Sequence, residues 1–536
     1  MQHSVESLAV QPGPNKRFLV RAADPTKPVI WKADTAWELF ARLTPEEAIL
    51  YLDNRKARGF NVIMAVALTE LDSVVPRGDP NEVTGPGGEV PGAGIANVTE
   101  FSFLPNRQGH LPLHDNDPSK PKEAYFAHID WVVKQAAERD LLVTLVPTWA
   151  RWVNMGWTSG PILFNEQSAE SFGRYIGQRY PFLPKILGGD TNPFWTGGGE
   201  LFKRYAKDGR DPYDEPLPTY EDLPVHDSRP LFRAMAQGIV ATEQLSWNKR
   251  FPGQTPFLTY HPTALWLPKY PEARASAFWN DEEWLTMDAV QSGHADFGNL
   301  PFSPPLAFWN SRSPHVAIGN MWNNTPVRPC IDLEGHYEAL HNALNSKNEW
   351  MWGEHDIRTG AWQSILSGAV GYVYGANSVW QMYEKDPSRP AVESVCGLDP
   401  SRSWRSDINL PGPSYLPHLW SLLESLSPEV FHSRQPAQDV LLASSSPDDL
   451  DSRVTVMRDV YGGEEGGSSI LIAHSGHGEK FELDLKKAFG SKKVEARWLD
   501  PRTGKESSVE GDVSSGIFTP PSRGGLEHDW VLVLRA

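Results

Sequence analysis

The chain has 536 residues, a length that exceeds one ordinary domain and suits a large α/β barrel followed by a small second domain. Its 50 Lys and Arg residues against 67 Asp and Glu residues give a net charge of −17. Because the sequence also lacks a long basic cluster, this balance argues against a nucleic-acid partner. The only cysteines are Cys330 and Cys396, so the fold is not a disulfide scaffold.

The first residues lack the apolar core of a secretory signal, and no apolar run reaches the roughly 18 residues that a membrane span needs. We therefore expect no membrane partner, and either an intracellular protein or the mature form of a secreted one. The 21 Trp and 15 Tyr residues favour a carbohydrate partner, since flat aromatic rings stack on the C–H faces of sugars. Core filling is the alternative for many of these rings. The sequence predicts no oligomeric state.

Short apolar runs alternate with amphipathic helical patterns over most of the chain, which predicts βα units and a parallel sheet. In chain order the predicted strands are residues 28–32, 61–68, 141–146, 185–187, 256–260, 287–291, 328–333 and 371–374. Between them the sequence predicts helices such as 44–58, where Thr44 and Glu47 are spaced as a capping box, and 125–139. Eight strands with crossover helices predict a closed (β/α)8 TIM barrel.

Three stretches are too long to be simple connections, namely residues 74–106, 192–228 and 296–314. Each follows the end of a predicted strand, so we expect all three on the active face of the barrel, where they shape the cleft. Surface decoration without a function is the alternative.

The pattern changes after about residue 427 to short alternating strands separated by turn signals. This spacing predicts a small all-β sandwich. We therefore divide the chain into a catalytic barrel over residues 1–426 and a sandwich over residues 427–536. The sandwich has few acids near strand ends, which favours a packing or carbohydrate-contacting role over chemistry.

Polar and aromatic side chains follow every predicted barrel strand. In a barrel the C-terminal strand ends meet at one face, where catalytic and substrate-binding groups lie. The candidates at these ends are Asp34, Trp37, Glu70, Trp149, Asp190, His261, Gln291, His294, Glu334, His336, Tyr337, Tyr374 and Trp380.

Asp190 and Glu334 are the two candidate catalytic residues, because they are acids at the ends of the fourth and seventh predicted strands. Cleavage of a glycosidic bond needs one protonated acid and one carboxylate, separated by about 5 to 5.5 Å for retention or about 6.5 to 9.5 Å for inversion. The sequence does not supply that distance.

Alternatives exist for several of these residues. Asp190 could cap a following helix, and Glu338, four residues after Glu334, could be the nucleophile. Asp34 could bind backbone amides at the barrel mouth instead of substrate. His261 and His294 are single histidines, which are more often hydrogen-bonding groups than metal ligands.

The motifs of other hydrolytic chemistries are missing from the sequence. No H-E-x-x-H, H-x-x-E-H or C-x-x-C pair occurs, so a zinc site lacks its usual spacing. There is no G-x-S-x-G elbow or Walker loop, and the glycines of residues 85–94 do not have dinucleotide-binding spacing. We predict neither a metal nor a cofactor.

Several blocks in fixed order carry a family resemblance. They are KADTAWELFARLTPEEAILYLDNRKARGFNVIMAVALTELD, HLPLHDNDPSKPKEAYFAHIDWVVKQAAERDLLVTLVPTWA, KILGGD, FLTYHP, DAVQSGH, IDLEGHYE and GAVGYVYGANSVWQM, with ARWLDPRTGK and FTPPSRGGLEHDWVLVL near the C-terminus. The first seven resemble the apiosidase-like family, glycoside hydrolase family 140. The last two resemble the small β-sandwich that often follows this barrel and is labelled a collagen-binding domain.

The resemblance implies a (β/α)8 barrel that acts on glycosides, with the acid/base aspartate at Asp190 and the nucleophile at Glu334. Where the family usually reads Asp-Gly-Glu-Pro, this chain reads Asp-Leu-Glu-Gly over residues 332–335. We predict a retaining hydrolase of O-glycosidic bonds in a polysaccharide or oligosaccharide, apiosidase-like or furanosidase-like. The other residues above, together with Glu338, are predicted to bind substrate.

Two other functions remain open from the sequence. The first is a carbohydrate-binding barrel that has lost catalysis. The second is a hydrolase or lyase of acidic polysaccharides, which would need a local basic cleft, for instance from Arg77, Arg107 and Arg151, because the net charge repels polyanions.

Overall fold

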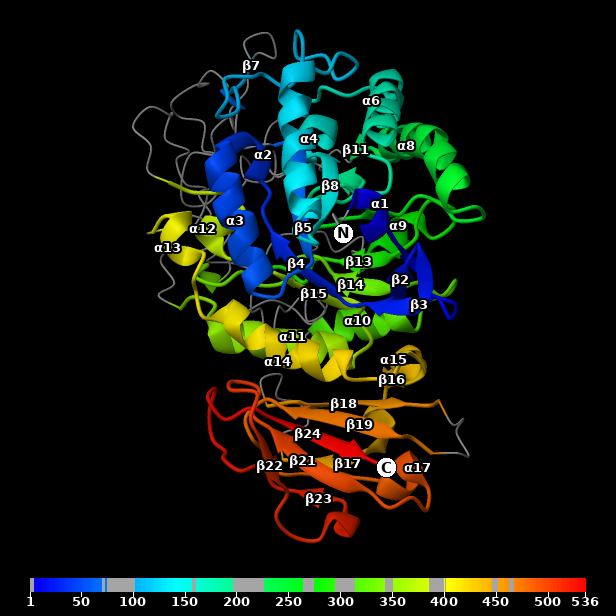
Figure 1. The fold of residues 1–536 in the computed structure, drawn as a ribbon, viewed down its shortest axis with the longest axis vertical. Coiled ribbons are helices and arrows are strands. Elements are labelled where there is room, and N and C mark those ends of the chain that lie inside the picture. The colour runs from blue at the N-terminus through cyan, green and yellow to red at the C-terminus, as the bar shows by residue number, and fades with distance from the viewer. Residues whose placement is uncertain are drawn as a thin grey trace, which may run out of the picture.

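The computed structural model describes residues 4–69, 73–74, 102–156, 161–195, 226–263, 274–294, 314–342, 350–384, 400, 402–445, 452–461 and 467–536. These residues form a large α/β part that contains the N-terminus and a smaller all-β part that contains the C-terminus (Figure 1). Among them, no helix is both long and apolar enough to cross a membrane.

Eight parallel strands form the centre of the α/β part. Six lie in one sheet in the order β12 (Leu258–Tyr260), β9 (Lys185–Leu187), β8 (Leu142–Thr148), β5 (Val62–Leu68), β4 (Trp31–Thr35) and β15 (Gly371–Tyr374). The other two, β13 (Asp288–Val290) and β14 (Cys330–Asp332), pair with each other. Thr286 N donates to Leu258 O beside β13, and Val370 N donates to Cys330 O beside β14, both at 2.9 Å. These bonds close the ring, so the predicted (β/α)8 barrel is confirmed.

The first barrel strand lies later than predicted. Residues 28–32 span two elements: the end of β3 (Asp24–Val29) and the start of β4. β3 belongs to an antiparallel sheet with β1 (Val10–Pro12) and β2 (Leu19–Arg21) outside the barrel. The apolar run of residues 28–31 covers the end of β3 and the start of β4, so the sequence pattern merges them.

Helices surround the barrel, as the alternating pattern predicts. The longer ones are α3 (Pro45–Ala57), α4 (Glu123–Ala137), α6 (Glu166–Arg179), α8 (Arg229–Arg250), α10 (Pro314–Trp322) and α11 (Glu354–Leu366). Shorter ones are α1 (Val5–Leu8), α2 (Leu39–Arg42), α5 (Arg151–Asn154), α9 (Ala275–Trp279), α12 (Asn377–Trp380) and α13 (Trp404–Asp407). The predicted capping box of α3 is present, with Glu47 N donating to Thr44 Oγ1 at 3.3 Å and Thr44 N to Glu47 Oε2 at 2.7 Å.

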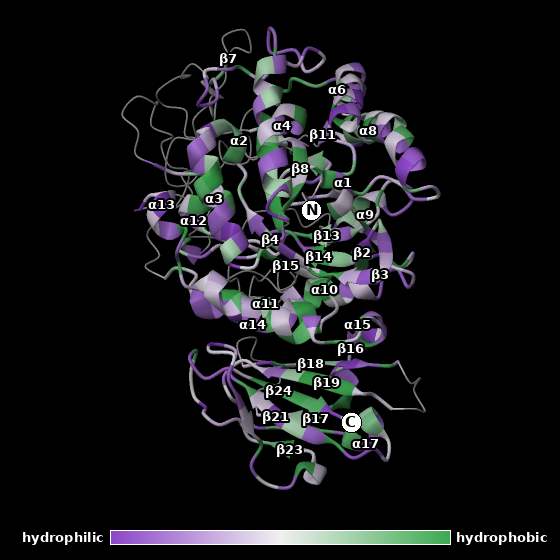
Figure 2. Ribbon diagram, viewed as in Figure 1, coloured by the Kyte–Doolittle hydropathy of each residue, from purple (hydrophilic) through white to green (hydrophobic). Residues whose placement is uncertain are grey.

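The barrel core is apolar on both faces of its strands. Every residue of β5 (VIMAVAL) and β8 (LVTLVPT) is buried. Such continuous apolar runs are typical of parallel strands that are covered by helices on one side and by the barrel interior on the other. Figure 2 shows the helices around them with mixed polarity, as surface helices require.

Two of the three long stretches begin and end as short antiparallel strand pairs. β6 (Ser73–Val74) pairs with β7 (Ser102–Phe103), and β10 (Phe194–Trp195) pairs with β11 (His226–Asp227). The pairs follow the C-terminal ends of β5 and β9, which is the expected active face. Residues 75–101, 196–225 and 295–313 lie outside the described residues, so the shaping of the cleft by these stretches stays a prediction.

The C-terminal part consists of two antiparallel sheets, which confirms the predicted β-sandwich. One sheet has the order β16 (Arg434–Pro436), β18 (Val454–Asp459), β19 (Ile470–Ser475), β24 (Trp530–Arg535), β21 (Glu495–Leu499) and β22 (Glu506–Ser508). The other has β17 (Leu441–Ser444), β20 (Phe481–Leu483) and β23 (Ile517–Phe518), and a short helix, α17 (Leu485–Phe489), follows β20. α14 (Gly412–Glu424) and α15 (Pro428–Ser433) lead into it, and the domain boundary at residue 426 stays a prediction.

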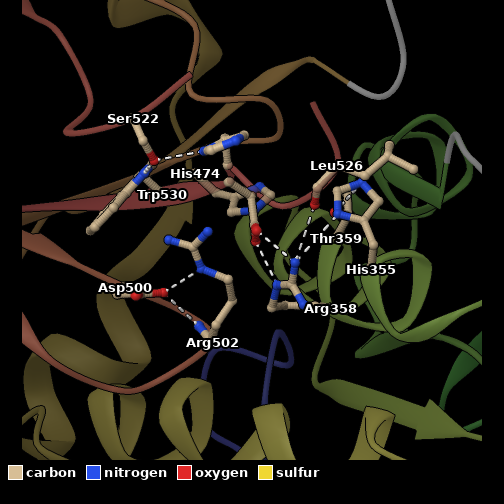
Figure 3. Close-up of polar contacts among 11 residues, drawn as sticks. His355, Arg358, Thr359, His474, Asp500, Arg502, Ser522, Leu526 and Trp530 are labelled. Atoms are coloured by element: carbon tan, nitrogen blue, oxygen red, sulfur yellow. Dashed lines mark hydrogen bonds and ion pairs between the residues drawn. The ribbon is translucent and has the colours of Figure 1, made fainter. Parts of the chain in front are cut away.

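α11 and α14 lie between the barrel and the sandwich (Figure 1). Met457, Ile472 and Val533 of the sandwich belong to the same apolar core as the barrel. Across this junction the Arg358 guanidinium of α11 binds both carboxylate oxygens of Asp529, at 2.8 and 2.7 Å. Figure 3 shows Arg358 near His355 and Thr359 of the same helix and near Leu526 of the sandwich. The two parts are therefore joined by buried apolar and ionic contacts.

Candidate active site

Asp190 stands at the end of β9 on a tight turn of left-handed residues. Gly188, Gly189 and Asp190 have φ angles of 96°, 69° and 55°. A Cβ at Gly188 would lie 2.5 Å from His261 O, and one at Gly189 would lie 3.1 Å from Trp149 Cα. The glycines thus let the turn fit between the ends of β8 and β12. After Asp190 the chain runs into β10 and not into a helix, so the capping alternative lacks a helix to cap.

Glu334 follows β14 and is held by two histidines. His294 Nε2 lies 2.8 Å from Glu334 Oε1, and His261 Nε2 lies 3.2 Å from Glu334 Oε2. His261 follows β12 and His294 follows β13, so three neighbouring strand ends supply this group. The side chain of His261 is fully buried, and that of Glu334 is 7% exposed. The structure therefore brings together three residues that the sequence predicts at separate strand ends.

His261 also reaches the other carboxylate residue. Its Nδ1 lies 3.3 Å from the backbone N of Asp190 and 3.0 Å from Pro262 O. One imidazole ring therefore stands between the backbone of Asp190 and the carboxylate of Glu334. Burial lowers the pKa of His261, but the bond to Glu334 and the charges of both carboxylates outweigh burial, so its pKa is raised. This favours a positively charged ring beside Glu334.

The two carboxyl groups differ in acidity. Burial and then the charge of Glu334 raise the pKa of Asp190 to about 6. Burial would also raise the pKa of Glu334, but the hydrogen bonds from His261 and His294 outweigh it and lower the pKa to about 2. Asp190 can therefore hold a proton under conditions where Glu334 is ionised, which is the division of roles that acid-assisted bond cleavage needs.

Aromatic rings surround this pair. Trp37 Nε1 donates to the Tyr337 hydroxyl at 3.2 Å, and the Trp37 ring lies 5.2 Å from Trp149 and 5.8 Å from His261, centroid to centroid. The Tyr337 ring also lies 4.5 Å from the ring of His294, centroid to centroid. Trp380 is half-buried, 6.4 Å from Tyr337. Four predicted aromatic contacts thus gather at one site.

Three predicted substrate contacts have their polar atoms engaged inside the protein. Asp34 is fully buried, 3.2 Å from Arg55 Nε, and accepts a hydrogen bond from the Tyr51 hydroxyl. Tyr374 donates to Glu338 at 2.6 Å, and Glu338 also accepts from Gly412 N, at 3.1 Å, at the start of α14. Each of the three is thus bound to other residues of the protein, and their contact with substrate stays a prediction.

The remaining predicted residues lie at or near the same face. His336 is buried and stacks on Trp352, with centroids 4.7 Å apart, and Gln291 is buried at the end of β13. Glu70 lies outside the described residues.

Trp352, which the sequence interpretation missed, donates from Nε1 to His294 O at 2.9 Å. The signal for it is weak, because Trp352 precedes α11 and follows no barrel strand.

Asp332 is the second residue that the sequence interpretation missed. Its Oδ1 accepts from Ser292 N at 3.1 Å and from Glu334 N at 3.3 Å. A signal was present, because Asp332 and Glu334 are two residues apart at one strand end and side chains of a strand alternate with that period.

Comparison with known proteins agrees with this architecture. The family described as "Apiosidase-like, catalytic domain" matches residues 13–429, and the family described as "Putative collagen-binding domain of a collagenase" matches residues 436–535. A search of curated proteins found no match.

Solved structures share the fold over nearly the whole chain. A glycoside hydrolase family 5 structure from Bacteroides vulgatus ATCC 8482 is 21% identical, with a TM-score of 0.72 and coverage of 98% of this chain and 93% of that chain. A second structure, titled "Glycoside hydrolase", is also 21% identical, with a TM-score of 0.72 and coverage of 98% and 96%.

The parallel barrel and the family match over residues 13–429 define a glycoside hydrolase. Within that class, the chain belongs to the apiosidase-like family, and a β-sandwich of the collagen-binding type follows its catalytic barrel.

Proposed function

We propose that this enzyme hydrolyses O-glycosidic bonds of a polysaccharide or oligosaccharide with retention of anomeric configuration. Asp190 is the general acid/base and Glu334 is the nucleophile. The observation that carries the proposal is that the His261 ring contacts both the backbone N of Asp190, at 3.3 Å, and the carboxylate of Glu334, at 3.2 Å, while the pKa of Asp190 is raised to about 6 and that of Glu334 is lowered to about 2. An inactive carbohydrate-binding barrel would have no need for this division.

In the first step the ionised Glu334 attacks the anomeric carbon and forms a glycosyl ester. Asp190 gives its proton to the glycosidic oxygen, and the leaving alcohol departs as that bond breaks. In the second step Asp190, now ionised, takes a proton from water as the water attacks the same carbon. The ester bond breaks, Glu334 becomes ionised again, and Asp190 regains its proton.

The histidines have a defined part in this cycle. His261 and His294 each place a nitrogen on a different oxygen of Glu334, at 3.2 and 2.8 Å. These bonds keep the nucleophile ionised before attack and stabilise it when it leaves the ester. Trp37, Trp149, Tyr337 and Trp380 supply ring faces and polar groups for the sugar, with His336 and Gln291 behind them.

An acidic polysaccharide is a weaker candidate substrate. Arg151 is only 1% exposed, and its guanidinium stacks on the Trp152 ring at 4.6 Å. It is therefore not presented to a polyanion. Arg107 is exposed, and Arg77 lies outside the described residues. A neutral glycoside fits the carboxylate-rich site better.

The function is tested on a panel of aryl glycosides and branched polysaccharides that includes a terminal furanoside such as apiose. NMR follows the anomer that forms first, and the double variant Asp190→Asn/Glu334→Gln controls for contaminating activity. We expect hydrolysis with the starting configuration in the first product and none with the double variant. Binding without product on every substrate contradicts hydrolysis, and an inverted first product contradicts the retaining mechanism.

The activity should fall on the alkaline side of about pH 6. Asp190 must carry a proton to act as acid, and its protonated fraction falls as pH rises through its pKa of about 6. Glu334 is ionised above about pH 2, so the acidic limb of the pH profile lies well below the alkaline limb. Above about pH 6, the pKa of Asp190, we expect kcat/KM to decrease about tenfold per pH unit. A pH profile of kcat/KM on one activated glycoside measures it.

Glu338 supplies the control for this profile. Burial raises its pKa to about 7, so it titrates in a similar range, but its partners are Tyr374 and Gly412. The Glu338→Gln variant should keep the alkaline limb. Loss of the limb in this variant would assign the titration to Glu338 and not to Asp190.

A further inference from the structure

We infer that Asp332 is a positioning residue for the reaction, since its carboxylate holds the segment that bears His294 against the segment that bears the nucleophile. This inference rests on the proposed roles of His294 and Glu334. It concerns a residue that touches neither the substrate nor the reacting atoms.

The contact geometry supports this role. Asp332 is the last residue of β14, it is 6% exposed, and a single oxygen, Oδ1, accepts from Ser292 N at 3.1 Å and from Glu334 N at 3.3 Å. Ser292 lies just beyond β13 and two residues before His294. One carboxylate oxygen therefore fixes the spacing between the loops that follow two neighbouring strands.

Backbone bonds continue the connection on both sides of Asp332. Leu333 N donates to Val290 O at 2.8 Å, and Gly293 N donates to Glu334 O at 3.1 Å. Beyond them His294 Nε2 reaches Glu334 Oε1 at 2.8 Å. The carboxylate of Asp332 is the side chain that accepts from the backbone of both loops, so a substitution there can loosen the loops without altering the backbone bonds directly.

The segment just after the nucleophile also lies beside this carboxylate. A Cβ at Gly335 would lie 3.4 Å from Asp332 Oδ2 and 3.6 Å from Ser292 Oγ. A side chain at this position would therefore be in ordinary van der Waals contact with both partners. The carboxylate is enclosed by the loops that it connects, which suits a group with a positioning role and not a substrate contact.

If Asp332 acts in this way, its loss should weaken the bond between His294 and Glu334. Glu334 would then lose part of the interaction that keeps it ionised, and the acidic limb of the pH profile would move upward by about 1 to 3 pH units. A displacement of a reacting group by about 1 Å lowers the rate by about 100-fold, which is the expected loss in kcat/KM near pH 5.5.

The test compares Asp332→Ala with Asp332→Asn on one activated glycoside, from pH 2.5 to 7, with recovery of activity at pH 6 as a control for unfolding. Asp332→Asn keeps an oxygen at the Oδ1 position and should keep most of the rate. Asp332→Ala should show the upward shift of the acidic limb. A uniform loss of rate with unchanged limbs, or no loss, would overturn the inference. If Asp332→Ala fails to fold, Asp332→Ser replaces it.

A double-mutant cycle with His294→Ala tests whether Asp332 acts through His294. In the His294→Ala background, Asp332→Ala should lower kcat/KM by about twofold or less, because the interaction that it supports is already gone. A full loss in that background would overturn the inference. If the proposed function is wrong, Glu334→Gln should keep the wild-type kcat/KM. This result distinguishes failure of the proposed function from failure of the inference about Asp332.

Discussion

The Glu334→Gln variant is expected to lose kcat/KM by at least about 10⁴-fold, in line with the loss when other hydrolases are deprived of their nucleophile. An amide at this position cannot form the glycosyl ester. It also removes the negative charge to which His261 and His294 are bound at 3.2 and 2.8 Å. Discontinuous assays with long incubation on an activated aryl glycoside measure a loss of kcat/KM of this size.

Glu338→Gln is the matched control, because it makes the same substitution four residues later. An amide oxygen at the Oε2 position can still accept from the Tyr374 hydroxyl and Gly412 N, which lie 2.6 and 3.2 Å from that atom in the wild type. We expect a loss of less than about tenfold, as for a buried hydrogen bond that is largely kept. The reverse result, with Glu338→Gln inactive and Glu334→Gln active, would make Glu338 the nucleophile.

The Glu334→Ala variant with added azide shows whether Glu334 acts as the nucleophile or only supports the structure of the site. Azide can enter the space that the carboxylate leaves and attack the anomeric carbon of an activated substrate. The product should be a glycosyl azide of inverted configuration, with part of the rate restored. A variant that is inactive only because its site has collapsed would give no such product.

The barrel and the ends of its strands could be predicted from the sequence because the relevant signals are local. Asp190 follows an apolar run and two glycines, and Glu334, His261 and His294 each follow a short apolar run. Parallel barrel strands bring their C-terminal ends to one face, so the topology alone places these residues together. The bonds between Glu334 and the two histidines follow from that convergence.

Contacts that depend on distant residues could not be predicted in this way. Asp34 pairs with Arg55 of α3, and Glu338 binds the start of α14, 74 residues later. Nothing in the strand pattern indicates either partner. The same holds for the first barrel strand, because one short apolar run joins the end of β3 to the start of β4, and these two strands lie in different sheets. Local patterns thus predict which residues reach a strand end, and tertiary packing decides what each side chain contacts there.

Breaking the buried ion pair between the barrel and the sandwich is expected to cost about 3 to 5 kcal/mol of stability, because it leaves a charge buried without its partner. Asp529→Asn removes the carboxylate that binds Arg358 at 2.8 and 2.7 Å. The two side chains are 4% and 0% exposed, so water cannot replace the lost interaction. Denaturant unfolding and the Tm measure the effect.

The control is Asp439→Asn, the same substitution in an exposed pair of the sandwich. Asp439 lies 2.8 Å from Lys487 Nζ, with the two side chains 53% and 46% exposed. Exposed pairs contribute about 1 kcal/mol or less, so this variant should unfold almost as the wild type does. Equal unfolding midpoints for Asp529→Asn and Asp439→Asn would contradict a stabilising role of the junction.

The pH dependence of the junction follows from the same pair. Burial would raise the pKa of Asp529, but the bonds from His474 and Arg358 outweigh it and hold the pKa below its usual range. A carboxylate with a lowered pKa stabilises the fold above its unfolded pKa of about 3.9, and this stabilisation is lost as pH falls through the folded value. The stability gap between wild type and Asp529→Asn should therefore narrow in acid.

Replacing both partners separates the cost of an unpaired charge from the value of the pair. Arg358→Met/Asp529→Asn should be less destabilised than the sum of its single variants, because neither charge is left without a partner. Arg358 belongs to α11, whose Gly360 lies so close to His336 that a Cβ there would be 2.9 Å from its Cε1. The same helix thus contacts the sandwich and the active face. If the sandwich supports the barrel structurally, variants of Arg358 and Asp529 should lose activity only to the extent that they unfold. The folded fraction of each variant should keep the wild-type KM.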